Sequence, residues 1–367
     1  IKKDPTQDVM VRGFFEGNQY YAFVTETFKD IRLVGAPPSS IGNFGKDSDN
    51  WMWPRHTGDF SMFRIYANKN NKPADYSPDN VPYVPKKSLN ISMSGVGERD
   101  FTMVFGFPGK TMQYLPSVAV EQIRAVSDPA KIMIRDKALA EIDQFMRADE
   151  KIKIQYAAKY AGISNAWKKW QGEVLGLTRT NAVGKKLNFE SIFQERVNNN
   201  PEFEGYRNLL PDFKTAYAES EPFTLARDYY TEIISKLELF SVASQLNGLA
   251  NAYANGGEAA FNKRKEASKT YFEKFYKDYS SAVDKKVFSS LLEVYMSQPD
   301  PYVSPALKAL YSASNNNYTI LTENIFNGET LSSEAYVSAL LEKDGKGFIE
   351  TISKLPIFAL QTDLTKT

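Results

Sequence analysis

The sequence has 367 residues, of which 42% are hydrophobic and 13% aromatic, and its formal net charge at pH 7 is +1. A chain of this size and composition can bury a large core and is predicted to form two domains. Its near-neutral charge argues against nucleic acid or an anionic membrane as a partner, and no apolar run approaches the roughly twenty residues that span a bilayer.

The supply of chemically reactive side chains limits the chemistry further. The chain has one histidine, His56, and no cysteine, which excludes a thiolate nucleophile, a disulfide, a thiolate metal site and a two-histidine metal site. Asp47-Ser48-Asp49 begins like a calcium loop, but Trp51 and Met52 stand where such a loop needs another oxygen ligand and a glycine. We therefore predict neither a metal nor a cofactor.

Residues 1–114 are predicted to form β structure. Short runs rich in aromatic and β-branched residues alternate with turn signals, and no helical pattern lies between them, which favours an antiparallel barrel. The predicted strands lie at residues 19–25, 31–34, 60–66, 89–93 and 101–107.

An aromatic loop at residues 33–61 is the most unusual feature of this region. It contains two of the four tryptophans and the only histidine, between the turn formers Pro37-Pro38, Pro54 and Gly58. Surface connections are normally small and polar, so large rings between rigid turns indicate a site held by a scaffold. Asp59 ends the loop where a strand is predicted to begin, a position at which a barrel presents functional groups.

The loop also carries a family resemblance. The run Asp49-Asn50-Trp51-Met52-Trp53-Pro54-Arg55-His56-Thr57-Gly58-Asp59-Phe60, with Gly35-Ala36-Pro37-Pro38-Ser39-Ser40-Ile41-Gly42 before it, resembles the signature of the bacterial dipeptidyl-peptidases seven and eleven. These are serine exopeptidases with a chymotrypsin-type double barrel and a large inserted helical domain. The resemblance implies an α+β fold, in which part of a chymotrypsin-like antiparallel β-barrel domain (residues 1–114) precedes a large all-α cap domain (residues 115–367).

The resemblance also implies roles for three residues. Asp59 matches the acidic member of the family's Ser-His-Asp triad, and Asn50 with Trp51 matches the pair that holds the free amino terminus of the substrate. A triad aspartate fixes the tautomer of the histidine and stabilises the imidazolium. Asn50 can offer its side-chain carbonyl to an ammonium group, and Trp51 a backbone carbonyl or the face of its ring.

The other two triad members are not matched. The family's histidine lies upstream of the aromatic loop and its serine lies far downstream, in a Gly-Asn-Ser-Gly-Ser-Pro type segment, and neither segment occurs in the sequence. We interpret the chain as an internal portion of such an enzyme and predict that it is inactive alone. His56 lies only three residues from Asp59, whereas triad members come from separate parts of a barrel, so a structural role for His56 is favoured over that of the base.

Helical periodicity begins after residue 114. Asp128 followed by Pro129 predicts a helix start, and residues 152–170 place Trp167 and Trp170 on one apolar face, where core packing is favoured over a cleft. Apolar residues spaced between positions 225 and 240 predict a further helix, which is expected to stop near Gly256-Gly257. Later helical segments are predicted to begin near Glu258, Asp284 and Ser332.

The family resemblance therefore implies a periplasmic or cell-surface dipeptidyl-peptidase that acts through an acyl-enzyme on peptides with a free amino terminus. A homodimer is the family's typical assembly, and Trp51-Met52-Trp53 leans toward the member that prefers an apolar residue before the cut. The alternative is a non-catalytic module that binds a peptide or protein through the aromatic loop. It explains the missing nucleophile but leaves Asp59 without a chemical task.

Overall fold

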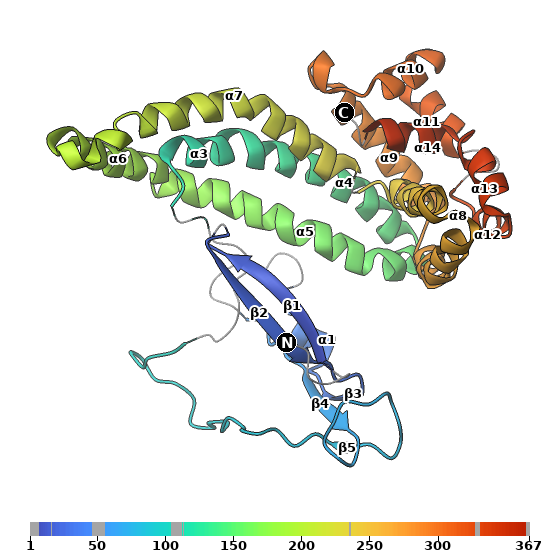
Figure 1. Ribbon diagram of the computed structural model, residues 1–367, viewed down its shortest axis with the longest axis horizontal. Helices are drawn as coiled ribbons and strands as arrows, with labels where there is room; N and C mark the ends of the chain where they lie inside the picture. Colours follow the sequence, from blue (N-terminus) through green and yellow to red (C-terminus); the bar gives the residue numbers. More distant parts are fainter. Residues whose placement is uncertain are drawn as a thin grey trace. The chain divides into compact units, whose positions relative to one another are not determined.

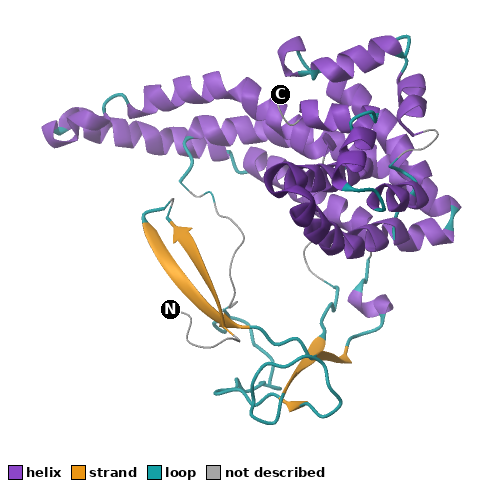
Figure 2. Ribbon diagram, turned by 45° about the vertical axis from the view of Figure 1, so that its right-hand side comes forward, coloured by secondary structure: helices purple, strands orange, loops and turns teal. Residues whose placement is uncertain are grey.

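The computed structural model describes residues 7–15, 17–45, 56–103, 112, 114–234, 236–326 and 331–364. The chain divides into two compact units, residues 1–110 and 111–367, which we call the strand unit and the helical unit. Figure 2 shows that strands occur in one unit and that helices dominate the other. The fold is α+β with a large helical domain, as predicted.

Two small antiparallel sheets lie in the described part of the strand unit. The first is a hairpin whose two strands pair from Gln7↔Glu26 to Phe14↔Gln19, around a turn in which Gly17 takes the left-handed conformation with φ +89°. The second has the order β3-β4-β5. The strands of the described residues are β1 (Gln7–Phe14), β2 (Gln19–Glu26), β3 (Ile31–Gly35), β4 (Met62–Ala67) and β5 (Val81–Pro82).

Three predicted strands are confirmed as β2, β3 and β4, and one prediction is wrong. Residues 89–93 alternate with period two but lie in an extended loop, where Leu89 is 91% and Met93 is 93% exposed. A strand needs a neighbour to satisfy its backbone groups, and the described residues provide none for this segment. Of the predicted strand at 101–107, residues 101–103 form a loop and the remainder lies outside the described residues.

The helical unit begins with an elongated group of helices (Figure 1). Its members in chain order are α3 (Ser117–Gln122), the π-helical turn η1 (Ile123–Ser127), α4 (Asp128–Ala148), α5 (Glu150–Arg179), α6 (Ala182–Asn199), the 3₁₀ turn η2 (Pro201–Tyr206), α7 (Leu209–Tyr229) and the π-helical turn η3 (Tyr230–Ile234). We call α3, α6, η2 and the adjoining ends of α5 and α7 the arm. Figure 1 shows that the arm extends away from the later helices of the same unit.

The later helices form a bundle around the main hydrophobic core. They are α8 (Glu238–Lys277), α9 (Ser281–Met296), η4 (Asp300–Tyr302), α10 (Pro305–Ala313), α11 (Tyr318–Phe326), α12 (Glu334–Leu341), α13 (Gly345–Ile352) and α14 (Pro356–Leu364). Helix α8 is kinked at Gly257, whose φ of +63° and ψ of −159° suit glycine alone. The predicted interruption at Gly256-Gly257 is therefore confirmed as a kink within α8.

Two predictions about helix ends need correction. Asp128 was expected to cap a helix, but α3, η1 and α4 run on as one rod, and the buried carboxylate of Asp128 instead pairs with Lys131 at 2.9 Å. Residues 225–240 were expected to form one helix, but α7 and η3 end before Glu238, where α8 begins. The carboxylate of Asp284 accepts hydrogen bonds from the backbone N–H groups of Glu238 and Leu239, each at 2.9 Å, and so caps the new helix from a distant segment.

The two tryptophans of α5 are not among the residues that form the main hydrophobic core or pack against it. Trp167 and Trp170 are half-buried, and the Trp170 ring lies beneath the side chains of Lys131 and Arg135, at 4.6 Å and 4.5 Å from its centroid. Arg135 also forms a buried ion pair with Glu232 at 2.7 Å, which joins α4 to η3. These contacts fix α5 against α4, and α4 against η3. None of the described helices is long and apolar enough to cross a membrane.

Candidate functional site

The segment that leads into β4 carries the predicted site residue Asp59. Helix α1 (Ser39–Gly42) forms where Pro38 accepts hydrogen bonds from the backbone N–H groups of Ile41 and Gly42, both at 2.9 Å. Gly58 in turn donates its backbone N–H to the carbonyl of Ile41 at 3.0 Å. The residue before Asp59 is thereby tied to α1, which the Pro-Pro run begins.

Gly58 lies close to the side chain of Ile41. A Cβ atom built on Gly58 would lie 3.0 Å from Cγ2 of Ile41, so a larger residue would require the Ile41 side chain to move by a few tenths of an ångström. The preceding residue is also held, because the Thr57 hydroxyl donates to the Phe44 carbonyl at 3.1 Å. Two consecutive residues before Asp59 are therefore fixed against the turn at α1.

The strand that follows Asp59 is fixed by pairing. β4 pairs with β3 through Ile31↔Ile65 and Leu33↔Phe63, and the register shifts between Leu33 and Gly35. Such a bulge bends a strand and is common beside functional sites. Asp59 precedes β4 by three residues and is exposed. No hydrogen bond or ion pair joins its carboxylate to another residue of the described ranges.

The remaining residues singled out from the sequence are Asn50, Trp51 and His56. Asn50 and Trp51 lie outside the described residues. His56 is exposed, and its ring packs edge-on against Phe44 with centroids 6.3 Å apart. The structural role favoured for His56 stays a prediction.

The sequence did not predict a polar network formed by Asp30, Arg32 and Asn80 at the start of β3. Asp30 is 2% exposed and accepts two hydrogen bonds from Arg32, at 3.0 and 2.9 Å, and a third from Asn80 at 2.9 Å. Hydrogen bonding to Arg32 lowers the pKa of Asp30 to about 2. The Arg32 guanidinium stacks 3.7 Å above the Tyr66 ring. The only local signal is the Asp-x-Arg spacing, which places two side chains on one face of a strand.

This network fixes the strands that carry the site. The Asp30 carbonyl accepts from the backbone N–H of Tyr66, at 2.8 Å, and Arg32 donates to the carbonyl of Ser77 at 3.0 Å. One ion pair thus joins the start of β3, the end of β4 and the loop before β5. No cluster of three or more His, Cys, Asp or Glu that could hold a metal ion is present among the described residues.

Comparison with known proteins decides the family. The profile of the family Peptidase S46 matches residues 1–367. The chain belongs to the peptidase S46 family. The Asp/Glu-specific dipeptidyl-peptidase of Flavobacterium psychrophilum is 51% identical over 352 residues, covering 96% of this chain and 49% of that protein. Dipeptidyl-peptidase 7 of Phocaeicola vulgatus is 34% identical over 354 residues, covering 94% of this chain and 48% of the relative.

Solved structures of the peptidase S46 family agree. The crystal structure of Porphyromonas endodontalis DPP11 in complex with the dipeptide Arg-Glu matches with a TM-score of 0.81 at 30% identity, covering 99% of this chain and 52% of the other. The resemblance read from the aromatic loop is confirmed at the level of the family. This S46 chain spans about half the length of the relatives that it matches.

Proposed function

We propose that this chain forms part of a serine dipeptidyl-peptidase that releases dipeptides from free amino termini through an acyl-enzyme. The observation that carries the proposal is the exposed carboxylate of Asp59 at the entrance of β4, in a chain of the peptidase S46 family. Asp59 accepts a hydrogen bond from the Nδ1–H of the triad histidine and stabilises the imidazolium that forms when the serine attacks. The histidine and serine come from segments that this sequence does not contain.

The fixed backbone before Asp59 supports this role. A triad acid works only while its carboxylate stays oriented toward the imidazole. The bond from Gly58 to Ile41 and the bond from Thr57 to Phe44 limit movement on one side. Pairing of β4 with β3 limits it on the other.

Asn50 and Trp51 are proposed to hold the substrate's ammonium group, on the family resemblance. The same resemblance, together with the two acidic-specific relatives at 51% and 48% identity, supports Asp or Glu as the residue before the cleaved bond. This preference replaces the apolar one suggested by Trp51-Met52-Trp53. We further propose that the helical unit caps the cleft and excludes water, and that the intact enzyme is a periplasmic or cell-surface homodimer.

The triad role of Asp59 is tested in the protein expressed from its complete reading frame. Asp59→Asn should lower kcat about 10⁴-fold, because the neutral amide no longer fixes the histidine tautomer, while KM changes little. The assay follows release of a fluorophore from a dipeptide substrate that ends in Asp. Asp79→Asn, another exposed aspartate of the strand unit, is the matched control and should retain full activity. A fall in kcat of less than tenfold for Asp59→Asn would remove it from the triad.

The amine anchor is tested separately. Asn50→Ala should raise KM for a free dipeptide substrate and weaken its selection over the acetylated peptide, because one acceptor for the ammonium group is lost. Equal cleavage of free and acetylated peptides by the unaltered enzyme would contradict the anchor.

The 367-residue chain alone is expected to release no dipeptide, since it lacks the family's nucleophile and base. Sustained turnover that a serine-directed inhibitor stops would show that the catalytic groups are misassigned. Tight peptide binding without turnover by the complete protein would favour the non-catalytic module.

A further inference from the structure

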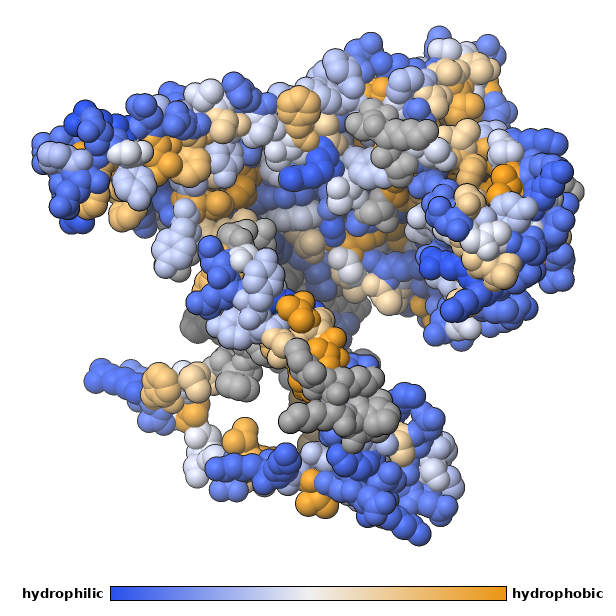
Figure 3. Space-filling view, in the orientation of Figure 1, coloured by the Kyte–Doolittle hydropathy of each residue, from blue (hydrophilic) through white to orange (hydrophobic). Residues whose placement is uncertain are grey.

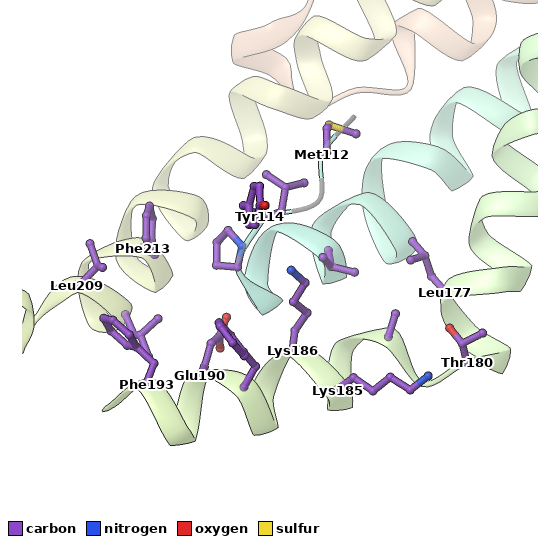
Figure 4. Close-up of a pocket in the computed structure, with 16 residues that line it drawn as sticks. Met112, Tyr114, Leu177, Thr180, Lys185, Lys186, Glu190, Phe193, Leu209 and Phe213 are labelled. Atoms are coloured by element: carbon purple, nitrogen blue, oxygen red, sulfur yellow. The ribbon is translucent and has the colours of Figure 1, made fainter. Parts of the chain in front are cut away.

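The arm joins the rest of the helical unit through three helical rods, which are α3-η1-α4, α5 and α7. The main hydrophobic core contains no residue between positions 164 and 228, so it ends before the arm. Figure 3 shows apolar side chains among charged ones on the surface of the arm. Figure 4 shows an open groove of about 730 Å³ between α3, α6 and α7. A change in the direction of the arm would therefore leave the core contacts intact.

The first rod is interrupted at η1. Its helical backbone continues into α4 through Asp128, but Pro129 follows directly. Proline has no N–H, and its ring crowds the carbonyl of the residue four positions earlier, which is Ala125 of η1. The π-helical turn thus lies where the rod loses a backbone hydrogen bond, and both features are common causes of helix bending.

The second rod is interrupted beside the first. Helix α7 contains Pro222 in its interior. Before both interruptions, the side-chain amide of Gln122 donates to the carbonyl of Tyr217 at 3.4 Å. After both, the hydroxyl of Ser127 donates to the carboxylate of Asp228. Pro222 and η1 therefore lie side by side in adjacent rods.

The third rod, α5, is weakened at the same level. It runs antiparallel to α4, and its Trp170 ring lies 4.6 Å from the ammonium of Lys131. The following turns of α5 lie beside η1, which α5 contacts, and they contain Gly172 and Gly176. A Cβ atom built on either glycine would meet nothing within 4 Å. Neither glycine is required by space, and each weakens the helix relative to alanine.

Polar contacts hold each side of this level together. On the arm side, the carboxylate of Glu190 accepts hydrogen bonds from the backbone N–H and the hydroxyl of Ser117, at 2.5 and 2.6 Å, which joins α6 to α3. On the other side, the buried ion pair of Arg135 with Glu232 joins α4 to η3. Two internally braced segments therefore meet at a level where every connecting rod is weakened.

We propose that η1, Pro222 and the turn of α5 at residues 172–176 form a hinge, about which the arm bends relative to the rest of the helical unit. The hydrogen bond between Ser127 and Asp228, whose residues are each 7% exposed, serves as the pivot because a buried carboxylate is costly to leave without its donor. The bend is internal to the helical unit, so it is distinct from any movement of that unit as a whole.

Double electron–electron resonance on the 367-residue chain measures the bend without substrate, and so independently of the proposed function. The chain has no cysteine, so two introduced cysteines carry the only spin labels. Three pairs of exposed positions are compared. Glu195→Cys with Ala282→Cys spans the hinge, Glu195→Cys with Lys214→Cys stays within the arm, and Ala282→Cys with Lys346→Cys stays within the bundle. The spanning pair should give a broader distance distribution than either internal pair.

Stiffening the hinge should remove this difference. Gly172→Ala and Gly176→Ala combined with Pro222→Ala should narrow the spanning distribution to the width of the internal pairs. The two glycine changes alone, which leave α7 untouched, should narrow it part of the way. Gly162→Ala is the matched control, because Gly162 is also exposed in α5 with nothing near its Cβ position but lies beside Arg135, away from the hinge. It should leave the width unchanged, and circular dichroism should show that no variant loses helicity.

Four results would overturn the hinge. A spanning distribution as narrow as the internal ones in the unaltered chain would mean that the arm is rigid. An arm pair as broad as the spanning pair would mean that the arm unfolds and does not bend. Unchanged width in the combined variant, or equal narrowing by Gly162→Ala, would mean that the flexible point does not lie at this level.

Discussion

The two units differ in where their large apolar side chains lie. In the helical unit, a continuous core includes fully buried Phe288, Leu291 and Phe348. In the described part of the strand unit, the buried residues are Asp30 and Ala67, while rings such as Phe101 are 89% exposed. Strand pairing sets the direction and register of the chain, but a hydrophobic core forms only when a second layer of secondary structure packs on the sheet.

The lengths of the relatives give this difference a physical reading. The curated relatives are about twice as long as this chain, so further polypeptide is available in them to cover an apolar sheet face. A helical bundle closes around its own core within one stretch of chain, because helix contacts are local. A barrel closes only when strands distant in sequence meet. The stability of the two units should therefore differ sharply.

Hydrogen exchange should show the largest contrast. Amides in α9 exchange only when the bundle opens, so we expect protection of about 10³-fold or more. Between residues 85 and 103, the backbone hydrogen bonds of the described residues are local turns, such as Asp100 N–H to the Gly97 carbonyl at 3.2 Å. The backbone amides of this segment should exchange at nearly the rate of an unstructured peptide. Mass spectrometry on the intact chain measures both segments in one sample.

The exchange contrast can fail in two ways. Strong protection across residues 85–103 would show that the strand unit forms stable backbone hydrogen bonds without additional polypeptide. Weak protection of α9 would show that the stability of the bundle depends on additional polypeptide. A dilution series controls for self-association, which would protect exposed strands only at high concentration.

Truncation of a core ring should have the next largest effect. Phe288 packs between Phe240 and Phe326, with ring centroids 5.8 and 5.2 Å away. Phe288→Ala should lower the free energy of unfolding by about 3–5 kcal/mol through lost burial and a cavity. Phe101→Ala in the strand unit should change it by less than about 0.5 kcal/mol. Urea unfolding followed by circular dichroism tests both, and similar losses for the two variants would erase the distinction between the units.

The sequence predicted features that depend on local pattern. Strand β4 follows from a run rich in aromatic and β-branched residues, and helix α5 from 3.6-residue periodicity. The structure adds the cap of α5, where Asp149 accepts from the backbone N–H of Lys151 at 2.7 Å. The gap between η3 and α8 could not be read locally. Ile233 before the gap and Phe240 after it belong to the same core, while the cap comes from Asp284, far along the chain.

The candidate site was predictable to the same degree. The motif singles out Asp59, which lies three residues before β4, and its triad role stays a prediction. The bond from Gly58 to Ile41 and the Asp30 network were not found, because each depends on how separate segments approach one another. Strand 89–93 was overpredicted, because alternation reports a face that could be buried and not the partner that buries it.

A smaller effect in the strand unit is expected on lowering the pH. The pKa of Asp30 is about 2 in the folded chain, below its ordinary value of 3.8, because Arg32 hydrogen-bonds the carboxylate. A folded pKa below the unfolded one means that the ionised carboxylate stabilises the fold above pH 4 and that this contribution is lost as the pH falls toward 2. NMR shifts of the Tyr66 ring, which stacks on Arg32, should therefore titrate with a midpoint near 2.

Two variants make this titration specific to the ion pair. Arg32→Lys keeps the charge but loses the two-point contact with Asp30, so the midpoint should move up toward 3.8. Asp30→Asn should remove the titration, because the amide carries no carboxylate. It should also free the Arg32–Tyr66 stack at every pH, because a neutral amide with one oxygen cannot accept both charge-assisted hydrogen bonds from Arg32. A midpoint that stays the same in Arg32→Lys would mean that Asn80 and the backbone, and not Arg32, hold the carboxylate ionised. The link between β3, β4 and the loop before β5 would then survive without its guanidinium.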